Sequence, residues 1–272
     1  MSAMGVDPQD STDLHGFYSF SERLKAVHYG PGCVQTALPK LVKQFGANKA
    51  MIVTGRSLYQ KRVEDVLRKA DAYGATFYEI GQHSPIGDIK KGIQMMKDVG
   101  ADIIVAVGGG SPVDASKAIL YNLQKETGGP TLYQIAIPTT LSAAEYTTGA
   151  GFTNEEGVKV AVASQELIPG GIILDAELTL ATPERLWLST GMRAVDHAAE
   201  GLYRALVPPP LKHLYYGALA DLFKYLAESK ANPQAIDVRQ KLQIASWMSL
   251  FPIRFETYSS ALRTAFLTVS LL

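Results

Sequence analysis

The sequence predicts an α/β domain with a parallel sheet, followed by an all-α domain. Three observations support this fold class. Short apolar runs rich in β-branched residues alternate with amphipathic segments in the first part of the chain. A glycine-rich turn directly follows one of these runs, and beyond Pro183 every periodic segment has helical spacing. We therefore expect a flexible leader over 1–19, an α/β domain over 20–180 and a helical domain over 181–272.

The elements follow from the pattern in order. A strand or hairpin is expected over 20–32, ending in a Gly-Pro-Gly turn, and a hairpin over 149–163. The other expected strands are 50–54, 76–80, 103–107, 133–138 and 172–174. The expected helices are 33–45, 58–73, 86–99, 114–123, 184–206, 211–230 and 238–251. Such strand and helix alternation gives parallel strands with right-handed crossovers and helices on both faces of the sheet.

The central glycine turn follows an apolar run that is typical of a strand buried on both faces. Gly108, Gly109 and Gly110 permit a sharp turn and a close approach of the backbone to a ligand. Ser111 is expected to cap a helix that begins at Pro112. Backbone N–H groups and a helix dipole would then meet at one place, which suits a phosphate or pyrophosphate. The alternative is a tight glycine turn without a ligand.

Composition excludes several classes of protein. The 272 residues carry 26 basic and 26 acidic side chains, which argues against a non-specific nucleic-acid binder. No apolar run of about 18 residues is present, so we expect no membrane segment. Cys33 is the only cysteine, and the polar first residues lack the pattern of a signal peptide. A cytoplasmic protein is expected.

Several motifs, in order along residues 20 to 250, together resemble the iron-containing alcohol dehydrogenase family, including its maleylacetate reductase branch. They are the turn Gly108–Ser111 with Asp114 and Lys117, Ile137–Thr140 with Glu145, Asp175–Thr179, Pro183, and Thr190–Met192 leading to His197, Ala198 and Glu200. The resemblance implies a dehydroquinate synthase-like architecture. It also implies an NAD(P)-dependent oxidoreductase that holds a small carbonyl or alcohol substrate in the cleft between its two domains.

The resemblance assigns cofactor contacts to the glycine turn, which would cradle the pyrophosphate. It places Thr139 and Thr140 beside the adenine or ribose, and Asp114 near the nicotinamide. The alternative for Asp114 is a carboxylate that stabilises a helix N-terminus. After the first strand, Gly55 and Arg56 stand where NAD-binding proteins carry an acid, and arginine there accepts a 2′-phosphate. We expect NADP to be preferred over NAD, unless Arg56 is only a solvated loop residue.

The metal ligands of the family are largely missing. Metal-using members carry an aspartate four residues before the first histidine of this helix; here Arg193 stands before His197. No histidine follows His213, so we expect no bound iron or zinc. Arg193 and His197 could instead bind a carboxylate and protonate a carbonyl. The alternative is that Arg193 pairs with Asp196 or Glu200 and that His197 is a core residue.

The chain also stops before a further set of helices found in the family. We expect this to leave apolar surface uncovered and to invite a partner, such as a homodimer. The residues concerned are Leu242, Trp247, Leu250 and Phe251. Two other functions stay open at this point. One is a nucleotide-binding protein without redox activity, and the other is an NAD-using lyase or isomerase of the dehydroquinate synthase type.

Overall fold

The computed structural model describes residues 16–18, 23–55, 61–81, 84–203, 207 and 209–251. Arg56 and the last 21 residues, 252–272, lie outside the described part. Residues 16–18 fall in the expected leader, but their backbone forms a strand that pairs with the next one. The division into domains near residue 180 stays a prediction.

Seven of the described strands form one sheet, in which the first strand is antiparallel and the others are parallel. In spatial order they are β1 (Gly16–Tyr18), β2 (Ala26–Tyr29), β9 (Gly171–Leu174), β6 (Tyr133–Pro138), β5 (Ile103–Gly108), β3 (Ala50–Thr54) and β4 (Tyr73–Phe77). Strands β3, β5 and β9 are buried at every position, which explains their continuous apolar sequences. The predicted parallel sheet is confirmed.

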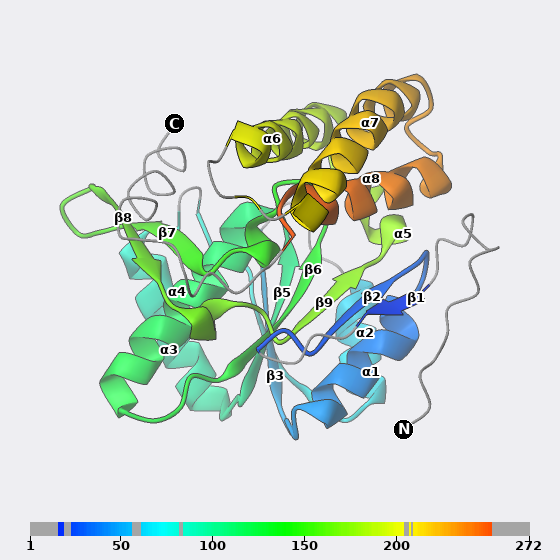
Figure 1. The fold of residues 1–272 in the computed structure, drawn as a ribbon. Helices are drawn as coiled ribbons and strands as arrows, with labels where there is room; N and C mark the ends of the chain where they lie inside the picture. The colour runs from blue at the N-terminus through cyan, green and yellow to red at the C-terminus, as the bar shows by residue number, and fades with distance from the viewer. Residues whose placement is uncertain are drawn as a thin grey trace.

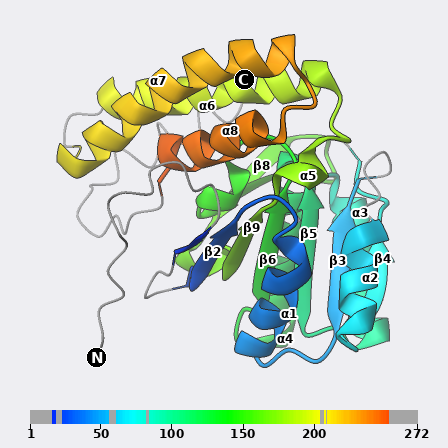
Figure 2. The same cartoon turned by 90° about the vertical axis from the view of Figure 1, so that its right-hand side faces the viewer.

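Helices cover both faces of the sheet (Figures 1 and 2). One face packs against α1 (Val34–Gln44) and α2 (Lys61–Lys69), and the other packs against α3 (Ile86–Val99) and α4 (Gly110–Thr127). The central strand β5 divides its apolar residues between the two layers. Val105 faces α1 and α2, and Ile104 faces α3 and α4. The alternation of the strand thus supplies both cores.

A helical layer covers the carboxyl ends of the strands (Figure 2). It consists of α5 (Ala176–Thr179), α6 (Glu184–Tyr203), α7 (Pro209–Ala231) and α8 (Ile236–Ser249). Helix α8 lies directly on the sheet. The Gln243 amide donates to Pro138 O at 3.2 Å, and the Gln240 amide donates to Leu174 O at 3.0 Å. These two bonds tie α8 to main-chain carbonyls at the ends of β6 and β9, and Leu174 O also accepts the N–H of Gly30 at 3.2 Å.

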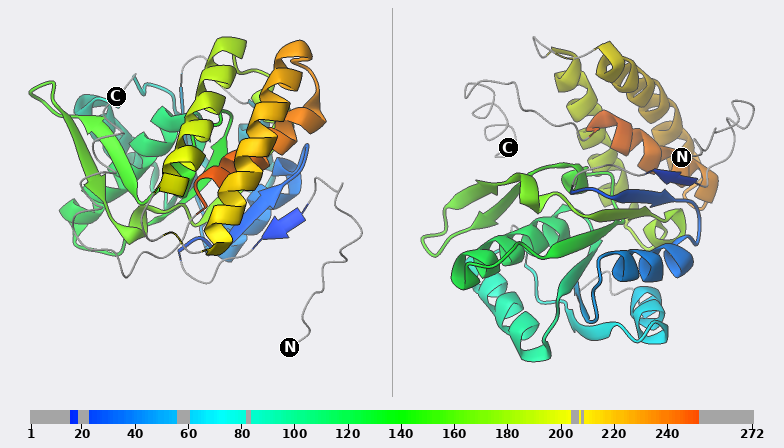
Figure 3. Two further views of the ribbon diagram at one scale, coloured as in Figure 1. Left: turned by 45° about the horizontal axis from the view of Figure 1, so that its top comes forward. Right: turned by 60° about the horizontal axis from the view of Figure 1, so that its bottom comes forward.

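The expected hairpin is present as β7 (Gly149–Thr153) and β8 (Lys159–Ala163). It extends from the body on the side away from β1 and β2 (Figure 3). Its Phe152 packs into the core beneath α3 and α4. The segment between β6 and β7 contains the 3₁₀ turn η2 (Ala144–Tyr146), and η3 (Gln165–Leu167) follows β8.

Two expectations from the sequence are wrong in detail. Helix α2 ends at Lys69 rather than at Tyr73, and Tyr73 instead begins β4, three residues before the expected strand. Asp71 explains the early stop, because its φ of 52° lies in the left-handed region and cannot continue a helix.

The expected apolar patch on the last helix is also wrong. Leu242 is fully buried, and Trp247 and Leu250 are each only 8% exposed. Leu242 packs against α6 and α7, whereas Trp247 and Leu250 share a core with Val27 of the sheet. These three side chains therefore offer no uncovered surface for a partner, and the fourth, the half-buried Phe251, stacks on Trp247 with 5.5 Å between the ring centroids.

Candidate functional site

The glycine turn joins β5 to α4 without a side-chain cap. Gly108 has a φ of 140°, Gly109 is the N-cap residue in an extended conformation, and α4 begins at Gly110. Ser111 therefore lies inside the first helical turn, so the expected Ser111 cap is wrong. Because glycine caps the helix through its backbone alone, the first-turn N–H groups have no capping side chain within the described residues.

The three glycines are required by close packing. A Cβ atom at Gly108 would lie 3.0 Å from Pro112, and one at Gly109 would lie 3.0 Å from Thr140. A Cβ at Gly110 would lie 3.3 Å from the Ser142 hydroxyl. The turn is thus pressed against the segment that follows β6, and larger residues would push the two apart.

The two threonines predicted to contact a cofactor lie beside this turn. The Thr139 N–H donates to Gly108 O at 2.8 Å, and both threonines are almost fully buried. The Thr140 hydroxyl lies 3.2 Å from the Ser142 hydroxyl. The Thr139 hydroxyl is buried and has no hydrogen-bond partner among the described residues. A ligand oxygen here would give that hydroxyl the partner it lacks.

Three strand ends meet beside the glycine turn, at the place where an open parallel sheet has its ligand crevice. Strands β3, β5 and β6 are neighbours in the sheet, with Thr54 of β3 opposite Val107 of β5. Gly55, which directly follows β3, has open space where its Cβ would be. Arg56 lies outside the described residues. The structure thus places Gly55 next to the glycine turn, as the sequence predicted; that these residues bind a cofactor stays a prediction.

Asp114 occupies the second turn of α4. Since the helix begins at Gly110, Asp114 is not in the first turn, and the alternative that it stabilises the helix N-terminus is wrong. Its carboxylate accepts the N–H of Gly151, which ties α4 to the hairpin. Burial raises its pKa to about 6, against the opposing effects of Lys117, Gly151 and Lys159.

Lys117 and Glu145 are two buried charged groups to which the sequence analysis gave no role. Lys117 is fully buried, and burial lowers its pKa to about 8. Glu145 is 1% exposed, and burial raises its pKa to about 7 although Lys117 opposes this shift. The sequence signal was the spacing of Asp114 and Lys117, which places both on one face of α4.

Arg193 and His197 are carried by α6 next to the carboxyl end of β6. Thr190, one turn earlier, accepts the Leu141 N–H at 3.1 Å through its hydroxyl, which fixes α6 against the segment after β6. Arg193 forms an ion pair with Asp196, as the alternative interpretation anticipated. His197 is half-buried rather than a fully buried core residue. Both side chains belong to α6, whereas the glycine turn lies between β5 and α4.

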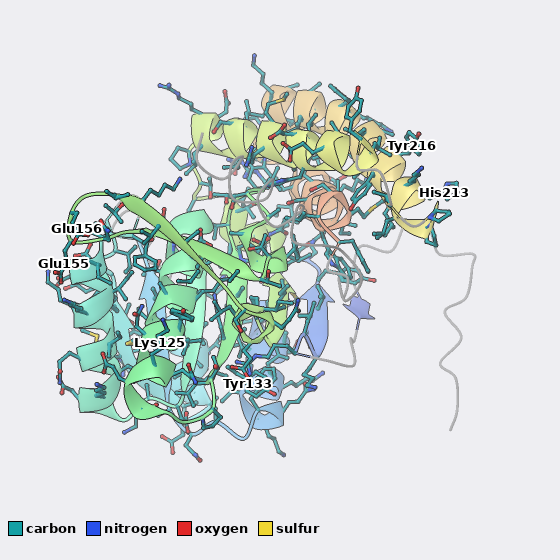
Figure 4. All side chains as sticks on the ribbon, turned by 60° about the vertical axis from the view of Figure 1, so that its left-hand side comes forward. Lys125, Tyr133, Glu155, Glu156, His213 and Tyr216 are labelled. Atoms are coloured by element: carbon teal, nitrogen blue, oxygen red, sulfur yellow. The ribbon has the colours of Figure 1, made fainter. Side chains whose placement is uncertain are left out.

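The donor set around α6 is poor for a metal ion. Arg193 stands one helical turn before His197, and its charge opposes a divalent cation at that position. His213 is exposed on α7, where Figure 4 shows it at the outer surface. Across the residues that the structure describes, no three histidine, cysteine or acidic side chains come together.

None of the described helices is long and apolar enough to cross a membrane.

Comparisons with known proteins agree with this architecture. The iron-containing alcohol dehydrogenase family model matches residues 25–176. Maleylacetate reductase of Rhizobium sp. (strain MTP-10005) is 30% identical over 209 residues, which cover 76% of this chain and 57% of the relative. The NAD-dependent methanol dehydrogenase of Bacillus methanolicus is 28% identical over 239 residues, covering 81% and 62% of the two chains.

A solved structure shows the same fold. The crystal structure of maleylacetate reductase from Agrobacterium tumefaciens superposes with a TM-score of 0.75 at 26% identity, over 86% of this chain and 64% of that one. The chain spans about three fifths of the length of the curated relatives it matches, 57% of one and 62% of another. The matched residues include the glycine turn, the threonines after β6 and Asp175. The chain therefore belongs to the iron-containing alcohol dehydrogenase family.

Proposed function

We propose that the protein is an NAD(P)-dependent oxidoreductase that transfers hydride between a nicotinamide cofactor and a small carbonyl or alcohol. One observation carries this proposal. The uncapped N-terminus of α4 lies beside the buried Thr139 hydroxyl, which lacks a partner among the described residues. A pyrophosphate would accept hydrogen bonds from both. The relatives named maleylacetate reductase and NAD-dependent methanol dehydrogenase support the assignment.

We further propose that the reaction does not use a metal ion. Arg193 takes the position of a ligand, and its planar guanidinium suits a substrate carboxylate when it leaves Asp196. His197, half-buried on the same helix, would protonate the oxygen of a carbonyl that is being reduced. The bound nicotinamide supplies the hydride. The chain's own residues bind the substrate, orient it and hold the proton.

The first experiment is a fluorescence titration with NADPH and NADH. Gly109→Asp places a bulky anion against Thr140 and in the path of a phosphate, so we expect saturable binding by the wild type to be lost. Gly129→Asp is the control at the other end of α4, where a Cβ meets only Thr127 at 3.6 Å. It should bind as the wild type does. A folded wild-type chain that binds neither cofactor would overturn the proposal.

The same titration tests the cofactor preference. Arg56 follows the first strand of the α/β unit, where an arginine accepts the 2′-phosphate of NADP. We expect NADPH to bind more tightly than NADH, and the difference to shrink in Arg56→Ala. Equal or tighter binding of NADH by the wild type would contradict this preference.

The role of His197 is tested by activity with a panel of short aldehydes and keto acids. His197→Ala should lower kcat by about 100-fold or more, which is the usual contribution of general acid catalysis. His213→Ala is the matched control, because this histidine is exposed on the outer surface of α7 (Figure 4). Full activity of His197→Ala would remove His197 from the mechanism.

A further inference from the structure

Lys117 is a buried lysine whose ammonium group is held mainly by main-chain oxygens. It lies one turn after Asp114 on α4 and is 0% exposed. Its Nζ atom donates to Ala144 O at 2.7 Å, Thr147 O at 2.8 Å and Gly149 O at 2.9 Å. The Thr147 hydroxyl lies at 2.9 Å. The lysine therefore joins α4 to three successive points of the segment between β6 and β7.

The chemistry of the ammonium group matches this environment. An ammonium ion has three N–H donors and no acceptor, and three carbonyl oxygens surround it. Hydrogen bonds from a charged donor are stronger than those between neutral groups. The negative charges of Asp114 and Glu145 also favour the protonated form. Because its partners are backbone atoms, Lys117 fixes the path of the chain rather than a particular side chain.

The segment that Lys117 holds forms one wall of the crevice. It leaves the carboxyl end of β6 at Thr139 and passes the glycine turn, where Ser142 and Ala144 lie 3.3 and 3.8 Å from a Cβ position at Gly110. Further along, Asp114 secures the N–H of Gly151. The helix whose N-terminus faces the crevice therefore also holds the facing wall in place.

We propose that Lys117 is a positioning residue for cofactor binding, which acts by holding residues 144–149 against α4 and so fixes the spacing between the glycine turn and its facing wall. The inference rests on the proposed dehydrogenase function. Lys117 is buried beneath the segment and acts on the cofactor only through the main chain of that segment. Its loss removes the charged donor from three carbonyl oxygens, although those of Ala144 and Gly149 stay within hydrogen-bond reach of the Thr147 hydroxyl. The segment then lacks its strongest tie to α4, and we expect it to shift.

The test compares two cations that donate to main-chain carbonyls, the buried Lys117 and the half-buried Arg23. Lys117→Met keeps the length of the side chain and removes its donors. Arg23→Met is the control, because the half-buried Arg23 donates to Thr131 O at 3.0 Å and Leu132 O at 2.5 Å before β6 begins. Figure 4 shows the neighbouring Tyr133 at the end of the sheet away from the helical layer.

Both variants should melt at lower temperature, but only Lys117→Met should bind NADPH or NADH about tenfold or more weakly, since small displacements of binding groups have large effects. Amide hydrogen exchange should become faster over 144–151 in Lys117→Met and stay unchanged there in Arg23→Met. Lys117→Arg, which can still donate to several carbonyls, should recover most of the affinity.

The outcomes separate the two proposals. If the wild type binds cofactor and Lys117→Met binds it equally well, this inference is overturned and the dehydrogenase proposal stands. If the wild type binds neither cofactor, both are overturned. Should Lys117→Met not fold, Thr147→Val removes the hydroxyl that contacts Lys117 Nζ and the carbonyl oxygens of Ala144 and Gly149. A loss of affinity of about threefold is then expected. The inference would also be overturned if a folded Thr147→Val variant bound the cofactor as tightly as the wild type and its amide hydrogens over 144–151 exchanged at the wild-type rate.

Discussion

Two buried carboxyl groups, those of Asp175 and Glu145, show how differently this fold treats polar atoms. Asp175 has a partner for each oxygen: Oδ1 accepts the N–H groups of Gly32 at 2.9 Å and Glu177 at 3.1 Å, and Oδ2 accepts that of Val34 at 3.1 Å. It thereby joins the turn before α1 to the start of α5. Each bond goes to backbone, so this junction is built for rigidity.

The crevice beside the glycine turn is different. The Thr139 hydroxyl is buried without a partner among the described residues, and the buried Glu145 carboxyl bonds only locally, to its own N–H group and to the neighbouring Tyr146 phenol. A buried polar group left unpaired costs about 1–3 kcal/mol, which the fold itself does not recover. The junction at Asp175 stabilises the sheet, whereas the region beside the glycine turn retains the unpaired Thr139 hydroxyl, where a ligand is proposed to bind. The contrast separates residues that hold the fold from residues that we propose to serve binding.

The largest effect should come from Asp175→Ala. This change leaves three backbone N–H groups unpaired, and we expect the free energy of unfolding to fall by about 3 kcal/mol or more. Urea denaturation measures it. Asp102→Ala is the matched control, because Asp102 also accepts main-chain N–H groups, from Asn48 and Lys49, but at an exposed site where water can replace it. The free energy of unfolding of Asp102→Ala should fall by about 1 kcal/mol. Equal losses would show that burial does not set the strength of the junction.

A smaller effect is expected from Glu145→Gln, and it should depend on pH. Burial raises the folded pKa of Glu145 to about 7, above its ordinary value of 4.5. Between these values the folded state holds a proton that the unfolded state has lost, so the stability of the wild type falls as pH rises from 4.5 to 7. The glutamine variant lacks this dependence. Relative to the wild type it should gain at most about 3 kcal/mol over that range.

The measurement is the free energy of unfolding of both proteins from pH 4.5 to 8. Asp114, whose pKa burial raises to about 6, contributes a slope of the same sign in both proteins, so the difference between them reports mainly on Glu145 and on its interaction with Asp114. If the free energies of unfolding of the two proteins changed with pH in parallel, Glu145 would be ionised in the folded state across this range and its charge would be neutralised by Lys117.

The sequence predicted the strands best where burial is most complete. Strand β3 and helix α3 have the expected bounds, because an apolar run buried on both faces and a regular amphipathic helix leave a clear periodicity. The start of β4 was missed, since the left-handed conformation of Asp71 has no signal in the helical pattern around it. Local backbone conformation, rather than hydrophobicity, set that boundary.

The site was predicted only in part, for a similar reason. Glycine spacing and strand order indicated the crevice, but the partners of Lys117 are main-chain carbonyls, which no side-chain pattern reveals. The same holds for Gln240 and Gln243, polar residues that face inward because they bond to strand ends. A prediction based on side-chain polarity alone would place such residues on the surface. Their burial follows from the docking of α8 on the sheet, which is a tertiary event.

The smallest effect should come from Arg62→Met, at the edge of the Asp175 junction. Arg62 forms an ion pair with the carboxylate of Glu177, and the two side chains are 44% and 35% exposed. Exposed ion pairs contribute about 0–1 kcal/mol and weaken in salt, so the variant and the wild type should converge near 0.5 M NaCl, where about 4 Å of screening length remains. Urea denaturation at low and high salt measures this. If Arg62→Met lowered the free energy of unfolding as much as Asp175→Ala does, the ion pair would be the main source of stability at this junction. The small decrease that we expect would show that the stability comes from the buried N–H bonds to Asp175, because both changes act on the same short helix α5.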